Sequence, residues 1–222
     1  MKWAGFSLKW YKQLFFHSDI LWGAVKNSLI VAIASSLIST IIGTFGAIGI
    51  YWYNFKYKKY LQVVTYFPLI IPDIIMGISL LILFAGIKWK LSLFTIFIAH
   101  TTFNIPYVLF IIMSRLDEFD YSIIEAAYDL GATEKDALLK VILPVTMPGI
   151  VSSFLMAMTL SMDDFVITFF VSGPGSSTLP LHIYSMIRFG VSPIINALSV
   201  ILIAITIIFA LSTRNIQKYM YN

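Results

Sequence analysis

Charged residues are scarce in this sequence. Asp, Glu, Lys and Arg together make up 12% of its 222 residues, about half of the roughly 25% that is usual for soluble globular domains. Apolar residues account for 59%, and the mean hydropathy is +0.88. A chain with so little polar side chain cannot cover a water-facing surface, so the composition predicts a membrane protein in contact with lipid.

Cysteine is absent altogether, which excludes disulfides and thiolate metal sites. The net charge of +4 is small, and in a membrane protein it reflects loop lysines, so no nucleic-acid partner is indicated. The three histidines, His17, His100 and His182, are far apart in sequence, and we expect His100 to be hydrogen-bonded inside a span. The glycine-rich segment 172–176 lacks the lysine of a phosphate loop and is expected to be an external turn. No catalytic, metal or cofactor site is predicted.

Long apolar runs are what the sequence does have. A helix needs about 20 apolar residues to cross ~30 Å of hydrocarbon, and five stretches qualify: 28–50, 61–86, 91–113, 147–171 and 194–212. Backbone polar groups in lipid need internal partners, so these stretches must be helices. We predict an all-α, polytopic membrane protein with about five transmembrane helices in a single domain, 1–222. Pro68 and Pro72 predict a bend within the second stretch.

The lysines and arginines do not orient these spans clearly. If the loop 114–146 is cytoplasmic, the cytoplasmic side holds eight of them and the outer side seven. Four lysines precede the first span, at positions 2, 9, 12 and 26, and five spans with an inside tail place this basic head outside, against the rule. A further span upstream of Met1 would remove the conflict. We therefore expect that this chain lacks an N-terminal helix.

The loop 114–146 carries a pattern of its own. Ser122 to Leu130 is predicted to form a short amphipathic helix, followed by Gly131 as its C-cap. One face of this helix would be shared by Ile123, Ala126, Ala127 and Leu130.

A second short helix is predicted after this glycine. Thr133 is a good N-cap, with Glu134 and Asp136 in the first turn, and Pro144 is expected to end the helix. The two helices would form an elbow outside the bilayer that presents a compact knob to a soluble partner. The alternative is a simple interfacial helix between two spans.

The spacing of residues in this loop resembles the signature of ABC importer permeases. The pattern is Glu-Ala-Ala, three residues, Gly, nine residues, then Ile-x-Leu-Pro, and it is matched here at Glu125, Ala126, Ala127, Gly131, Leu143 and Pro144. Val141 stands where the family usually has Ile. The resemblance implies that the elbow forms coupling helices, that it docks on separate ATPase subunits, and that ATP is bound there and not by this chain. Glu125 would then pair with a basic group of the ATPase.

Other stretches resemble the spermidine/putrescine permeases within that family. They are 71–74, 79–81, 160–165, 181–186, 190–193 and 196–198, and the similarity extends from about residue 3 to about 212. The resemblance implies a six-span fold whose first span is missing here, a second homologous permease, and a periplasmic or lipoprotein polyamine-binding protein. It also implies a multi-pass location in the bacterial inner membrane, in contact with membrane lipid.

Acidic residues inside the predicted spans are limited to Asp73, Asp163 and Asp164. Intramembrane carboxylates are costly and usually face a cavity, and a polyamine needs carboxylates along its path. Phe165 and Tyr184 would add cation–π attraction of roughly 0.5–2 kcal/mol each. We therefore predict these five residues as the substrate path. The alternatives are a packing or hydrogen-bonding role for Asp163 and Asp164, and helix capping for Asp73.

Three other functions compete with a polyamine importer. The same type of permease would suit another small substrate, such as a metal ion or an osmolyte. A channel or a non-ABC secondary transporter would explain the aspartates but would leave the loop spacing as coincidence. A membrane enzyme or electron carrier would need paired intramembrane histidines or a polar catalytic cluster, and the sequence has neither.

Overall fold

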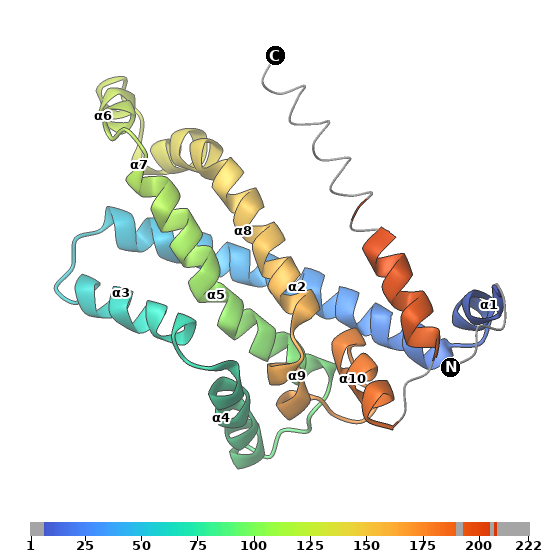
Figure 1. The fold of residues 1–222 in the computed structure, drawn as a ribbon. Coiled ribbons are helices and arrows are strands. Elements are labelled where there is room, and N and C mark those ends of the chain that lie inside the picture. Colours follow the sequence, from blue (N-terminus) through green and yellow to red (C-terminus); the bar gives the residue numbers. More distant parts are fainter. Residues whose placement is uncertain (1–6, 190–192, 205–206, 208–222) are drawn as a thin grey trace.

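The structure is a computed structural model that describes residues 7–189, 193–204 and 207. Within these residues every regular element is helical (Figure 1), so the all-α prediction is confirmed. In chain order the helices are α1 (Lys9–Phe16), α2 (Asp19–Trp52), α3 (Lys58–Tyr66), α4 (Asp73–Gly86), α5 (Leu93–Asp117), α6 (Ser122–Asp129), α7 (Glu134–Ala137), α8 (Leu143–Asp163), α9 (Val166–Val171) and α10 (Leu179–Phe189). A 3-10 turn at Phe67–Leu69 follows α3, and a π turn at Leu138–Ile142 joins α7 to α8.

Three described helical segments are long and apolar enough to cross a membrane, namely α2, α5 and the continuous segment Glu134–Asp163. A fourth candidate is broken: Lys58–Leu69 and Asp73–Gly86 meet at 103°. The bend predicted from Pro68 and Pro72 is therefore confirmed, and it divides the stretch 61–86 into two helices. The missing N–H groups of the two prolines weaken the helix at this point.

The last two predicted spans differ in how far the structure describes them. The stretch 147–171 is interrupted after Asp163 and resumes as α9. The stretch 194–212 begins as an apolar helix, Pro193–Ala204, and most of its remainder lies outside the described residues.

Helices α2, α5 and α8 pack against one another and form the centre of the molecule (Figure 1). α2 and α5 approach closely at Gly43, where an added Cβ would lie 2.6 Å from Val108 Cγ1 and 3.3 Å from the carbonyl oxygen of Ile105. Only glycine permits this approach, as expected where membrane helices pack through small residues.

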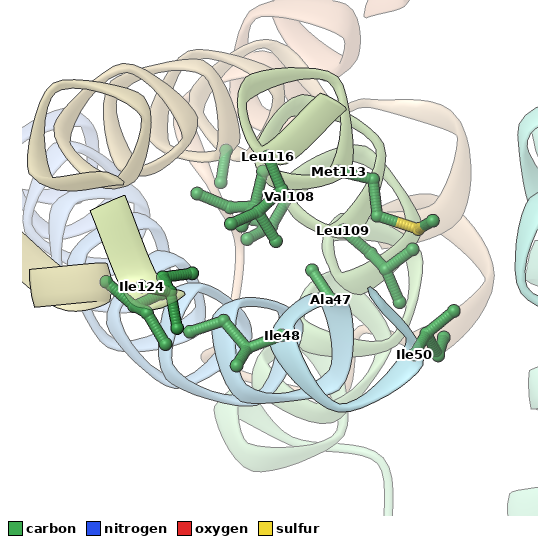
Figure 2. Close-up of a cluster of buried hydrophobic side chains, with 11 residues drawn as sticks. Ala47, Ile48, Ile50, Val108, Leu109, Met113, Leu116 and Ile124 are labelled. Carbon is green, nitrogen blue, oxygen red and sulfur yellow. The ribbon is translucent and has the colours of Figure 1, made fainter. Parts of the chain in front are cut away.

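One buried apolar cluster extends from this centre to the elbow. Figure 2 shows Ala47 and Ile48 of α2 together with Val108 and Leu109 of α5, and with Ile124 of α6 beside them. Ile124 is fully buried. The same hydrophobic contacts that hold the spans together therefore fix the position of the elbow.

Candidate functional site

The first elbow helix, α6, ends in a glycine-dependent turn. Gly131 has φ +85°, its N–H donates to the Tyr128 carbonyl at 2.9 Å, and the Ala132 N–H donates to the Ala127 carbonyl at 3.0 Å. These two bonds form a Schellman motif, in which glycine adopts the left-handed conformation without a Cβ penalty. An added Cβ would meet nothing within 4 Å, so the backbone conformation and not a lack of space requires glycine. The predicted C-cap is confirmed.

The second elbow helix, α7, begins at a capping box. The Asp136 N–H donates to Thr133 Oγ1 at 3.2 Å, and the Thr133 N–H donates to the Asp136 carboxylate at 3.4 Å. Each side chain thus satisfies a backbone donor that the helix start leaves unpaired. The predicted N-cap at Thr133 is confirmed.

The prediction that Pro144 ends this helix is wrong. Instead α7 continues through the π turn into α8, whose first turn contains Leu143 and Pro144. Within the π turn the Leu143 N–H donates to the Leu138 carbonyl, five residues back. The extra residue shifts the hydrogen-bond register, so the proline's missing N–H and its ring are tolerated at the start of α8.

The apolar face predicted for α6 points away from the protein. Ile123 is 45% exposed, Leu130 is 89% exposed, and Ala126 is also exposed, whereas Ile124 on the opposite side anchors the helix. Glu125 is exposed and makes no ion pair within the part of the chain that the structure describes. The elbow therefore presents a small apolar face beside a carboxylate.

One hydrogen bond stabilises the start of α6, and another attaches α7 to the end of α2. The Ser122 N–H donates to the Asp120 carboxylate at 3.0 Å, which holds the pKa of that carboxyl below its usual range. Tyr53, just beyond α2, donates to Glu134 of α7, and this hydrogen bond raises the pKa of the Tyr53 phenol because the nearby carboxylate disfavours a phenolate. The elbow is therefore attached to α2 as well as to its own spans.

An acidic cavity of about 270 Å³ lies between α4, α5 and the break that separates α8 from α9. Its lining includes four of the five residues predicted for the substrate path, Asp73, Asp163, Asp164 and Phe165, together with Phe103 and Tyr107 of α5. Tyr184 is outside this lining. Its ring packs on Phe165 with centroids 4.5 Å apart and is 41% exposed.

Asp164 is fully engaged by the protein. It accepts hydrogen bonds from Thr168 N and Thr168 Oγ1, both at 2.8 Å, and from the Ile167 N–H at 3.2 Å. His100 Nε2 lies 3.2 Å from the same carboxylate, which is 7% exposed. Asp164 therefore caps α9, and the hydrogen-bonding role considered as an alternative applies to it.

His100 joins this carboxylate to the central helices. Its Nδ1 lies 2.7 Å from Ser161 Oγ, and Ser161 is in turn 3.3 Å from Ser35 Oγ of α2. The expectation of a hydrogen-bonded His100 is confirmed. Sequence reasoning missed its partners Ser161 and Thr168, because their positions in the chain give no sign that they meet one histidine.

Asp163 and Asp73 differ from Asp164. Both are exposed at the cavity, and neither side chain forms a hydrogen bond within the described residues. Asp73 is the first residue of α4, where the positive end of the helix dipole favours a carboxylate. These two carboxylates are the ones that remain available to a cationic ligand.

Comparison with known proteins identifies the class of protein. The sequence profile of the family described as "Binding-protein-dependent transport system inner membrane component" matches residues 39–221, and this chain belongs to that family. It is a multi-pass inner-membrane permease, and the prediction of an ABC importer permease is confirmed. 

Individual relatives extend this similarity over nearly the whole chain. The spermidine/putrescine transport system permease protein PotC of Escherichia coli K12 is 39% identical over 98% of this chain and 82% of its own length. The putrescine transport system permease protein PotI of the same organism is 42% identical over 90% of this chain and 74% of its own length. PotC of Haemophilus influenzae is 39% identical over 98% of this chain and 84% of its own length.

A solved structure shows the same fold. A chain from inward-facing MetNI methionine ABC transporter aligns with a TM-score of 0.69 over 92% of this chain and 95% of its own. The two sequences are 17% identical, so this likeness concerns the fold alone.

The two neighbouring aspartates should differ in their effect on stability. Asp164→Ala removes an acceptor from two buried side chains, His100 and Thr168, and we expect a loss of about 2–4 kcal/mol. Asp163→Ala removes an exposed carboxylate and should change the stability by less than ~0.5 kcal/mol. Thermal unfolding of the detergent-solubilised chain measures the change in stability of both variants. Equal midpoints for the two variants would contradict the roles assigned here.

Proposed function

We propose that this chain, as one permease domain over residues 1–222, is the membrane subunit of an ATP-driven polyamine importer. The observation that carries the proposal is the identity of 39% over 98% of the chain with a permease named for spermidine and putrescine. The acidic and aromatic lining of the cavity supports the proposal independently. The chain itself supplies no ATPase activity, since ATP is bound and hydrolysed by partner subunits.

The cavity suits an organic polycation. The exposed carboxylates of Asp73 and Asp163 would attract ammonium groups, and Phe103, Tyr107 and Phe165 supply aromatic walls for cation–π contacts. Tyr184 extends this aromatic surface beyond Phe165. A second, homologous permease would complete the path, and a binding protein on the outer side would deliver the substrate.

The elbow would receive the force of ATP hydrolysis. Its outward face, with the exposed Glu125 and Ala126, the half-buried Ala127 and the turn at Gly131, is small enough to enter a groove on an ATPase subunit. The segment Glu134–Asp163 is one continuous run of 30 residues, about 45 Å long, with Leu143 and Pro144 inside it. A push on the elbow therefore reaches Asp163 at the cavity through a single helical segment.

Other substrates and mechanisms have less support. Two carboxylates would also attract a divalent cation, but the aromatic walls favour an organic ion. A channel or a non-ABC secondary transporter does not agree with the family to which the chain belongs.

Asp163→Asn should impair substrate recognition without affecting folding. The variant keeps the side-chain shape but loses the charge, and we expect the KM for putrescine uptake to rise on the order of tenfold, since a hydrogen bond to a charged group is worth roughly 1.5–3 kcal/mol. Uptake of labelled putrescine into cells with equal amounts of transporter measures it. Asp129→Asn, at the end of α6, is the matched control and should leave the KM unchanged. Normal uptake kinetics in Asp163→Asn would place this carboxylate off the path.

Gly131→Leu should uncouple ATP hydrolysis from transport. The side chain disfavours φ +85°, so the turn would open and the elbow would lose its shape, while membrane insertion continues. Gly131→Asn is the control, because asparagine tolerates the left-handed conformation better and should retain more uptake. The measurement is uptake per ATP hydrolysed. A Gly131→Leu variant with wild-type coupling would argue against this role for the elbow.

A further inference from the structure

Helix α1, which carries Lys9 and Lys12, lies at the opposite end of α2 from the elbow (Figure 1). α2 has 34 residues, about 50 Å of helix, and thus exceeds the ~30 Å hydrocarbon core. Its C-terminal end is attached to the elbow through the hydrogen bond from Tyr53 to Glu134, and α1 precedes its first turn. With the elbow in the cytoplasm, as in the proposed function, α1 lies at the level of the outer headgroups.

Side-chain packing and one hydrogen bond hold α1 against the end of α2. Leu14 is 1% exposed and packs with Leu21, Leu179 and Leu198, and Trp22 Nε1 donates to the Leu14 carbonyl at 3.0 Å. Figure 1 shows α1 crossing the end of α2 at a steep angle. We take α1 to lie along the membrane surface, since it does not continue the α2 span.

The outer face of α1 combines aromatic rings with positive charge. Phe15 is 51% exposed and Phe16 is 77% exposed, and Lys9 and Lys12 are exposed beside them. The helix contains no Asp or Glu, and neither lysine forms an ion pair within the described residues. Both lysines also line a groove with Leu8, Gln13 and His17. Lysines and aromatic residues together are typical of helices that lie in a membrane interface.

We propose that α1 is an interfacial anchor that binds anionic phospholipids of the outer leaflet. Lys9 and Lys12 contact the lipid phosphate groups, and Phe15 and Phe16 enter the boundary between headgroups and acyl chains. Charge complementarity identifies the occupant, since each lysine near an anionic surface adds to the attraction. The proposal also gives Lys9 and Lys12 a function on the side where the positive-inside rule disfavours them.

The test measures lipid binding to the full chain purified in a zwitterionic detergent. Short-chain phosphatidylglycerol is titrated while the thermal unfolding midpoint is recorded, and native mass spectrometry counts the bound lipids. We expect a saturable rise in the midpoint that is reversed by high salt and is not reproduced by phosphatidylcholine or by inorganic phosphate. In the double variant Lys9→Gln with Lys12→Gln, the phosphatidylglycerol concentration at half-saturation should rise about tenfold or more.

Lys88→Gln with Lys90→Gln is the matched control, because it removes two exposed lysines from the connection between α4 and α5 on the same side of the membrane. This variant should keep the phosphatidylglycerol response. An equal response to both lipids, or an equal loss in both double variants, would overturn the proposal. So would an intact lipid response in Lys9→Gln with Lys12→Gln accompanied by weaker capture of the binding protein, which would assign this face to a protein partner. The assay uses no polyamine and no ATP, so its outcome is independent of whether the proposed substrate is correct.

Discussion

The helical segment Glu134–Asp163 joins the elbow to the acidic cavity, and its continuity depends on one backbone device. Pro144 would normally break a helix at this point, but the π turn at Leu138–Ile142 supplies an extra residue that accommodates it. Buried contacts of Ile124 and Ile142 attach both parts of the elbow to the central helices. A force on the elbow is therefore carried by packed side chains and by a continuous helix, instead of being absorbed by a loop.

The other end of that segment is held by hydrogen bonds. After Asp163 the helix breaks, and a break inside a membrane leaves backbone groups that need partners. Asp164 supplies them at the start of α9, and His100 and Thr168 secure its carboxylate. The break also separates the two neighbouring aspartates by function, because Asp164 stabilises the structure while Asp163 is left at the cavity. In this way one polar cluster both permits the break and sets the position of the exposed carboxylate.

How far the sequence predicts these features depends on the range of the interactions. Gly131 and Thr133 act on residues within four positions of themselves, so the elbow helices and their caps could be predicted. The apolar runs located the three long spanning helices in the same way, but the stretch 61–86, predicted as one bent span, forms two helices that meet at 103°. The partners of Asp164 include His100, which is 64 positions away, and no local pattern announces that contact. The end of the second elbow helix was wrongly placed at Pro144 because a π turn has no sequence signal comparable to a helix cap. The 103° angle between the α3 segment and α4 depends on packing with α5 and α9 as well as on proline.

If the elbow drives the cavity through the continuous segment Glu134–Asp163, interrupting that segment should uncouple ATP hydrolysis from transport. The test is a variant with two glycines inserted after Lys140, within the π turn. Putrescine uptake and ATP hydrolysis are compared in proteoliposomes that contain the complete transporter. ATP hydrolysis should continue while uptake per ATP falls at least tenfold, which corresponds to a loss of about 1.4 kcal/mol of coupling. Uptake per ATP equal to that of the unmodified transporter would contradict this role of the segment.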